Sequence, residues 1–185
     1  MRRRALILLA LSLPSPAHAA GVEEVMRGLA AVRQSRAVFS ETRSIPELEG
    51  VLPSRGTLSW RAPDQVEKHT TEPVEERLTV TADTLTLERR GARQVLNLDA
   101  APEVRAMVEA IRGTLAGDLA RLSTFYDVRF SEPADGSWRL ALYPRSARLA
   151  AAVQAIVITG RDAQITGVET QERGGITRMT IEARP

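Results

Sequence analysis

The sequence predicts a mainly β domain with helices (α+β): a strongly curved antiparallel sheet covered by an N-terminal helix and a central helical lid. Three observations predict this class. Apolar and polar residues alternate in many short runs, turn residues separate these runs, and two longer segments carry apolar residues at helical spacing. Alternation indicates strands with one buried face, and close turns indicate antiparallel hairpins. About nine or ten such strands are enough to make a sheet curl strongly.

The predicted strands alternate most clearly in residues 57–60, 77–82, 84–88, 138–142, 156–158, 165–168 and 177–181. The predicted turns are Ala82-Asp83, Arg90-Gly91, Asp135-Gly136, Gly160-Arg161-Asp162 and Gly174-Gly175. Glycine and aspartate tolerate the left-handed backbone that tight hairpin turns require. Consecutive strands are therefore expected to be neighbours in the sheet.

Two helices are expected to cover this sheet. The first has an apolar stripe of Val22, Val25, Met26, Leu29 and Val32. The second runs from Pro102 to about Leu122, with Pro102 suited to a first turn and with Gly113 and Gly117 predicted to break it into two pieces. A sheet with one apolar face needs such a cover, so the N-terminal helix and this central helical lid are expected on the same face.

The N-terminus has the three parts of a secretory signal peptide. Arg2, Arg3 and Arg4 precede a short apolar run over residues 5–13, and Ala17-His18-Ala19 supplies a small-residue cleavage site. The apolar run is much shorter than the roughly 20 residues that span a bilayer. We expect residues 1–19 to be removed and residues 20–185 to form one exported domain, located in the periplasm.

Composition narrows the function classes. The sequence pI is about 9.6. Without the three N-terminal arginines the chain has 22 basic and 23 acidic residues, a formal net charge of −1. The predicted mature domain is therefore not basic, and nucleic acid is not an expected partner. The absence of cysteine in the sequence excludes thiolate catalysis and cysteine-ligated metals.

We predict no enzyme activity, no cofactor and no metal site. The predicted mature chain keeps a single histidine, His69, and none of the common nucleophile, phosphate-loop or zinc-protease motifs occurs. Adjacent acidic residues such as Glu75 and Glu76 point to opposite faces of a strand and read as solvated surface. The arginines Arg89, Arg90 and Arg93 flank a turn, where they either keep the protein soluble or meet anionic headgroups or a partner.

The order of elements resembles a known family. A signal peptide and one helix precede Phe39-Ser40-Glu41-Thr42-Arg43, and then come the segment from Gly56-Thr57-Leu58-Ser59-Trp60 to Pro63 and a later Pro73. This pattern resembles the periplasmic outer-membrane lipoprotein carrier family, LolA, and in particular a divergent branch of it. The resemblance implies a single domain over residues 20–185 that forms an incomplete β-barrel. Its concave apolar face, closed by helices, would shelter the acyl chains of a cargo.

The resemblance also implies partners. They are a lipidated protein or an envelope lipid or glycolipid, with an inner-membrane donor complex and an outer-membrane acceptor, and the carrier is expected to be a monomer that shuttles cargo toward the outer membrane. The cargo stays open between lipoprotein, glycolipid and lipid-linked pigment. Two alternatives remain: a non-catalytic envelope scaffold, and an exported enzyme built around His69.

Candidate residues follow from the predicted buried face. The candidate lining of the lipid-binding face comprises Phe39, Leu58, Trp60, Leu78, Val80, Leu85, Leu87, Met107 and Ile111. The same alternation is equally typical of a filled core. An arginine of the family falls on Glu67 here, so Arg61, Glu67 and Lys68 are the candidate polar residues for handling cargo.

Overall fold

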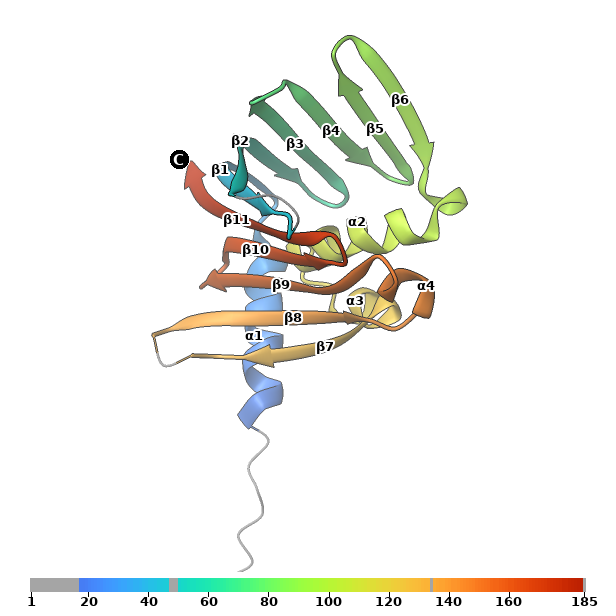
Figure 1. The fold of residues 1–185 in the computed structure, drawn as a ribbon. Coiled ribbons are helices and arrows are strands. Elements are labelled where there is room, and N and C mark those ends of the chain that lie inside the picture. Colours follow the sequence, from blue (N-terminus) through green and yellow to red (C-terminus); the bar gives the residue numbers. More distant parts are fainter. Residues whose placement is uncertain (1–16, 47–49, 134, 185) are drawn as a thin grey trace, which may run out of the picture.

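The computed structural model describes residues 17–46, 50–133 and 135–184. Most of the predicted signal peptide, residues 1–16, lies outside the described residues. The described chain forms one eleven-stranded sheet with helices packed on one of its faces (Figure 1). This confirms the predicted fold class, with eleven strands in place of nine or ten.

The strands are β1 Gln34–Ser44, β2 Val51–Arg61, β3 Gln65–Glu72, β4 Glu76–Thr81, β5 Thr84–Arg89, β6 Ala92–Asn97, β7 Tyr126–Ser131, β8 Ser137–Pro144, β9 Val153–Arg161, β10 Gln164–Glu172 and β11 Gly175–Arg184. Their order in the sheet is β6-β5-β4-β3-β2-β1-β11-β10-β9-β8-β7, and all neighbours are antiparallel. Pairing of β1 with β11 joins the two ends of the domain in the middle of the sheet. The strands rotate along the sheet, so that β3–β6 run at a steep angle to β7–β9 (Figure 1).

The helices are α1 Ala17–Ala31, α2 Pro102–Leu115, α3 Leu119–Phe125 and α4 Ala147–Ala150, with a 3-10 turn, η1, at Leu98–Ala100. α2 and α3 lie between the edge strands β6 and β7 in the chain, and so form the predicted central insertion. The predicted break at Gly113 is wrong, because Gly113 lies inside α2 with Leu122 of α3 packed against it. The break occurs at Gly117, whose φ of +65° and close approach to the Met26 carbonyl oxygen leave no room for a Cβ.

The main hydrophobic core occupies only one half of the sheet. Its buried members come from α1–α4 and from β7, β8 and β9: Met26, Leu29, Ala106, Ala110, Leu122, Tyr126, Trp138, Leu140, Leu142, Leu149, Val153, Ile156 and Ile158. α1 and α3 contact β7, and α4 contacts β8 and β9. None of these core residues lies on β1–β6. The helices therefore form a hydrophobic core with β7, β8 and β9, and β1–β6 lie outside this core.

Candidate functional site

The register of the sheet brings seven of the nine candidate lining residues onto one face. Leu58 of β2 lies opposite Lys68 of β3, Lys68 opposite Leu78 of β4, and Leu78 opposite Leu87 of β5. Directly opposed residues share a face, and residues two apart along a strand do so as well. The seven residues on this face are Phe39, Leu58, Trp60, Leu78, Val80, Leu85 and Leu87.

This face is the one that the helices cover. Phe39 of β1 lies opposite Ile181 of β11, and the register continues from Met179 of β11 to Val168 of β10 and Ile158 of β9. Ile158 belongs to the main core beneath the helices. We call this side of the sheet the inner face, and the opposite side the outer face.

Burial changes along the inner face of β2–β5. Trp60 and Val80, near the helices, are buried, and the indole nitrogen of Trp60 donates to the Val32 carbonyl at the end of α1 over 3.0 Å. One layer further from the helices, the leucines are only half-buried: Leu58, Leu78 and Leu87. We call these three side chains the leucine strip. Apolar side chains that neighbouring residues cover only in part can contact an apolar ligand.

A charged pair interrupts the leucine strip on the inner face, because Lys68 lies between Leu58 and Leu78. The ammonium of Lys68 lies 2.8 Å from Glu41 Oε2, and 4.9 Å from the ring centroid of Phe39. Phe39 is buried, and its ring packs against Gly56, where a Cβ would come within 2.9 Å of it. Gly56, in the segment that resembles the family pattern, therefore makes room for the Phe39 ring. Lys68 is the only cationic side chain among the opposed positions of the leucine strip, and its charge is paired with that of Glu41.

The three candidate polar residues are not brought together. Lys68 is on the inner face, whereas Glu67, its neighbour in β3, is on the outer face and lies 2.5 Å from Arg77 Nη1. Arg61 is exposed and lies on the outer face, because it follows the inner-facing Trp60 in β2. Of the three, Lys68 alone therefore lies on the same face as the leucine strip.

The two candidates on α2 differ from those on the sheet. Ile111 is half-buried and packs against the main core, on the β7–β10 half of the molecule. Met107 is 37% exposed. Ile111 therefore belongs with the main core, and Met107 is an exposed residue of α2.

A buried carboxylate joins the two central helices. Glu109 of α2 is 0% exposed, and its oxygens accept from Arg112 of the same helix and from Arg121 of α3, with Arg121 Nε at 2.5 Å. Burial would raise the pKa of Glu109, but the hydrogen bonds from both arginines outweigh it and hold the pKa below its ordinary value. A charge buried in this way is stable only while both partners remain.

Arg112 also connects α2 to the sheet. Arg112 Nη1 donates to the Ala82 carbonyl, in the turn between β4 and β5, over 2.5 Å. Nearby, Arg105 of α2 lies 2.9 Å from Asp83 in that turn and 2.5 Å from Asp99 in η1. We call these contacts the α2 anchor. They fix the helical lid at the end of the strands where Val80 is buried.

His69 contacts two charged side chains. Its Nε2 lies 3.1 Å from Glu75 Oε1, and its Nδ1 lies 3.2 Å from Arg77 Nη2, on the outer face of β3 and β4. Within residues 17–46, 50–133 and 135–184 there is no group of three or more side chains suited to hold a metal ion. None of the helices in those segments is long and apolar enough to cross a bilayer.

Comparison with known proteins identifies the family. A family model described as outer membrane lipoprotein carrier protein LolA-like matches residues 14–184. No curated protein sequence matches the chain.

Several solved structures are similar. A LolA superfamily protein from Nitrosomonas europaea is 10% identical, with 89% of this chain and 91% of that chain covered and a TM-score of 0.49. Lipoprotein LppX from Mycobacterium tuberculosis is 11% identical, with 91% and 95% covered and a TM-score of 0.49. A chain of the MucA/MucB complex from Pseudomonas aeruginosa is 11% identical, with 87% and 55% covered and a TM-score of 0.45. Because the family model spans nearly the whole sequence, the chain belongs to the LolA-like outer membrane lipoprotein carrier family.

Proposed function

We propose that this protein is a non-catalytic periplasmic carrier that binds the acyl chains of a lipidated protein or envelope lipid on the inner face of β2–β5. Membership of the LolA-like family and the signal-peptide pattern of residues 1–19 support this role. The single observation that carries it is the leucine strip. Its half-buried side chains lie on a face that is otherwise used for packing.

The energetics suit a reversible carrier. Each methylene that moves from water into an apolar site contributes about 0.8 kcal/mol. A chain lying across three leucines therefore gains several kcal/mol without any catalytic group. The leucine strip lies on β2, β4 and β5, outside the main core. Cargo can therefore bind and leave without the core being opened.

Lys68 is the cation we assign to handling cargo. Its ammonium is on the inner face, held by Glu41 and the Phe39 ring, so it can meet a polar linkage while the acyl chain contacts leucine. Of the two other polar candidates, Glu67 is paired with Arg77 on the outer face and Arg61 is exposed there. Exchange with an inner-membrane donor and an outer-membrane acceptor follows from the proposed role.

Native mass spectrometry tests the proposal. Protein purified gently from the periplasm is expected to carry an acyl-bearing adduct, which solvent extraction then identifies as lipoprotein, glycolipid or pigment. An apo mass that persists after incubation with envelope lipids would instead favour an envelope scaffold.

A matched pair of variants locates the binding face. Leu87→Asn changes the leucine strip, while Val95→Asn changes an aliphatic side chain on the next strand that is 62% exposed and faces outward. Loss of one or two methylene contacts predicts a roughly 4- to 15-fold weaker affinity for palmitate in Leu87→Asn. Val95→Asn is expected to bind as the wild type does. Equal affinities in all three proteins would contradict binding on the inner face.

A further inference from the structure

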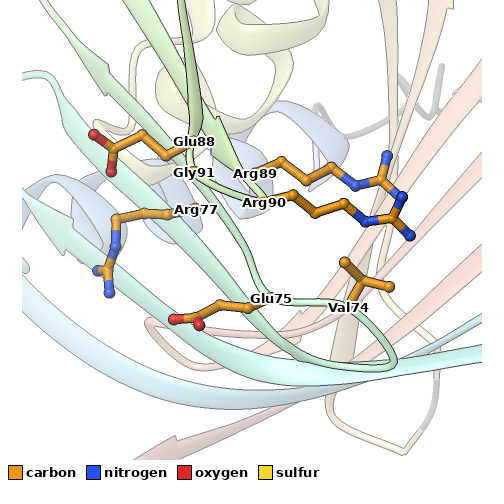
Figure 2. Close-up of a pocket in the computed structure, with 7 residues that line it drawn as sticks. All are labelled: Val74, Glu75, Arg77, Glu88, Arg89, Arg90 and Gly91. Carbon is orange, nitrogen blue, oxygen red and sulfur yellow. The ribbon is translucent and has the colours of Figure 1, made fainter.

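A surface hollow of about 250 Å³ lies at the ends of β4 and β5 that are farthest from the α2 anchor (Figure 2). It is formed by the loop between β3 and β4, represented by Val74 and Glu75, and by the turn between β5 and β6 at Arg90 and Gly91. Three arginines and two glutamates contribute to its lining. The hollow is thus bounded by two hairpin ends whose side chains are mostly charged.

The side chains around the hollow divide between the two faces of the sheet. In Figure 2, Arg89 and Arg90 extend to the same side as Val74, whereas Arg77 and Glu88 extend to the other side. Arg89 is on the inner face, because it follows the inner-facing Leu87 by two residues. At Arg90 the φ of +51° marks the turn, where the strand alternation no longer applies. Two consecutive arginines therefore extend in one direction.

Two arginines on the outer side of these hairpins are paired with carboxylates: Arg77 with Glu67 at 2.5 Å and Arg93 with Glu88 at 3.8 Å. His69 Nε2 lies 3.1 Å from Glu75 on the same side. The acidic residues of these contacts are engaged there and face away from the two consecutive arginines.

The inner side is different. Arg89 Nε lies 3.5 Å from Glu76 Oε2, and the Arg89 side chain is 53% exposed. Arg90 has no carboxylate within 4.0 Å among the residues that the structure describes. Glu76 therefore matches the charge of Arg89, and the charge of Arg90 is left unmatched on this side. Arginine pairs of this kind bind phosphate oxygens through parallel, charge-assisted hydrogen bonds.

The arginines lie directly beyond the leucine strip. Leu87 and Arg89 are on the same face of β5 and two residues apart, which corresponds to about 7 Å along a strand. Leu78 and Glu76 stand in the same relation on β4. The inner face therefore changes from apolar to charged over about 7 Å, with Arg89 and Glu76 next to the leucines.

We propose that Arg89 and Arg90 form a binding site for the phosphate headgroup of an anionic lipid whose acyl chain lies on the leucine strip. This inference rests on the proposed carrier function and adds the chemical class of the ligand. A free phosphate ester offers the same anionic group without the chain, and the two sources are separated by experiment.

The test compares three probes on the full mature chain by titration calorimetry below the critical micelle concentration. The probes are palmitoyl-lysophosphatidylglycerol, the uncharged monopalmitoylglycerol, and glycerol phosphate. The wild type is expected to bind the anionic lipid about tenfold more tightly than the uncharged one, and this preference should shrink at high salt. Glycerol phosphate is expected to bind far more weakly than either lipid, because it lacks the chain.

Variants assign the preference to the two arginines. The double variant Arg89→Gln and Arg90→Gln is expected to lose the tenfold preference and keep its affinity for monopalmitoylglycerol. Arg93→Gln, on the outer side of the same hairpin, is expected to behave as the wild type does. All these positions are exposed, so melting temperatures check that the fold is kept.

The outcomes separate this inference from the carrier function. If both lipids bind equally well, before and after the arginine changes, the headgroup site is refuted and the carrier function stands. If neither lipid binds, the carrier function itself fails. If glycerol phosphate binds as tightly as the anionic lipid, the site serves a free phosphate and the assignment to a lipid is overturned.

Discussion

Replacing Glu109 with glutamine tests whether the buried carboxylate holds the helical lid together. Glu109 is fully buried between Arg112 of α2 and Arg121 of α3. Glutamine keeps the shape and one acceptor oxygen but removes the charge that both guanidinium groups face. Arg112, itself almost fully buried, is then left without a counter-ion.

The expected cost follows from that burial. Removing one partner of a buried ion pair costs about 3–5 kcal/mol, and we expect the lower end because glutamine still accepts one hydrogen bond. For a chain of this size, about 3 kcal/mol corresponds to a fall in melting temperature of roughly 6–12 °C. Arg43→Gln is the control, because Arg43 is half exposed and its pair with Glu172 at 3.0 Å is worth about 1 kcal/mol or less.

Thermal and urea unfolding measure both variants, at pH 7 and across acidic pH. The pKa of Glu109 is held below its ordinary value in the folded state, so its contribution is present above the unfolded pKa of about 4.3. That contribution is lost as the pH falls through the lower folded pKa. The gap between wild type and Glu109→Gln should therefore narrow below about pH 4. A Glu109→Gln protein as stable at pH 7 as the Arg43→Gln control would refute the reasoning.

Two further predictions concern the sheet and its contact with α2. Gly56→Ala should destabilise the fold by about 1–3 kcal/mol in urea unfolding, because a Cβ would come within 1.9 Å of the His69 carbonyl oxygen; unchanged stability would show that β3 can shift freely. Tyr126→Phe should cost about 1 kcal/mol, because it removes the hydrogen bond of 2.8 Å to the Ala106 carbonyl. Burial raises the pKa of Tyr126, so the wild type should lose stability above about pH 10 more steeply than Tyr126→Phe; parallel pH profiles would contradict this.

Much of the fold could be predicted because local signals agree with it. The turns at Ala82-Asp83 and Arg90-Gly91 have the left-handed residues that hairpins require, and they define the register of β4–β6. The alternation then places Leu58, Leu78 and Leu87 on one face, as the structure does. The alternation of apolar and polar residues depends only on neighbours along one strand, so the same residues share a face in any sheet that these hairpins form.

The strands at the two edges were harder to recognise. β6 presents Val95 to solvent on the outer face, so its apolar residues do not mark a buried side. β7 did carry a usable signal, because Tyr126, Val128 and Phe130 alternate with polar residues and pack on the core. β7 begins directly after α3, so no turn residues separate the helical spacing of apolar residues from the strand spacing.

The sequence does not show which apolar residues pack on the main core and which lie outside it. Ile111 and Leu87 are both half-buried aliphatic residues on a predicted buried face, yet Ile111 packs on the main core and Leu87 lies outside it. The difference depends on where the lid docks, which contacts distant in sequence decide, such as that between Arg112 and Ala82. Replacing Ile111 with glutamate would consequently disturb the core, so Leu87 is the cleaner position for testing lipid binding.

The most direct test of acyl-chain binding on the inner face is photoaffinity labelling with a palmitate analogue that carries a diazirine near the end of its chain. Peptide mapping should place the label on β2, β4 and β5, around Leu58, Leu78 and Leu87, and unlabelled palmitate should compete it away. A saturable label elsewhere, for example in the hollow of about 230 Å³ lined by Val22 and Phe130 between α1, α3 and β7, would contradict the account.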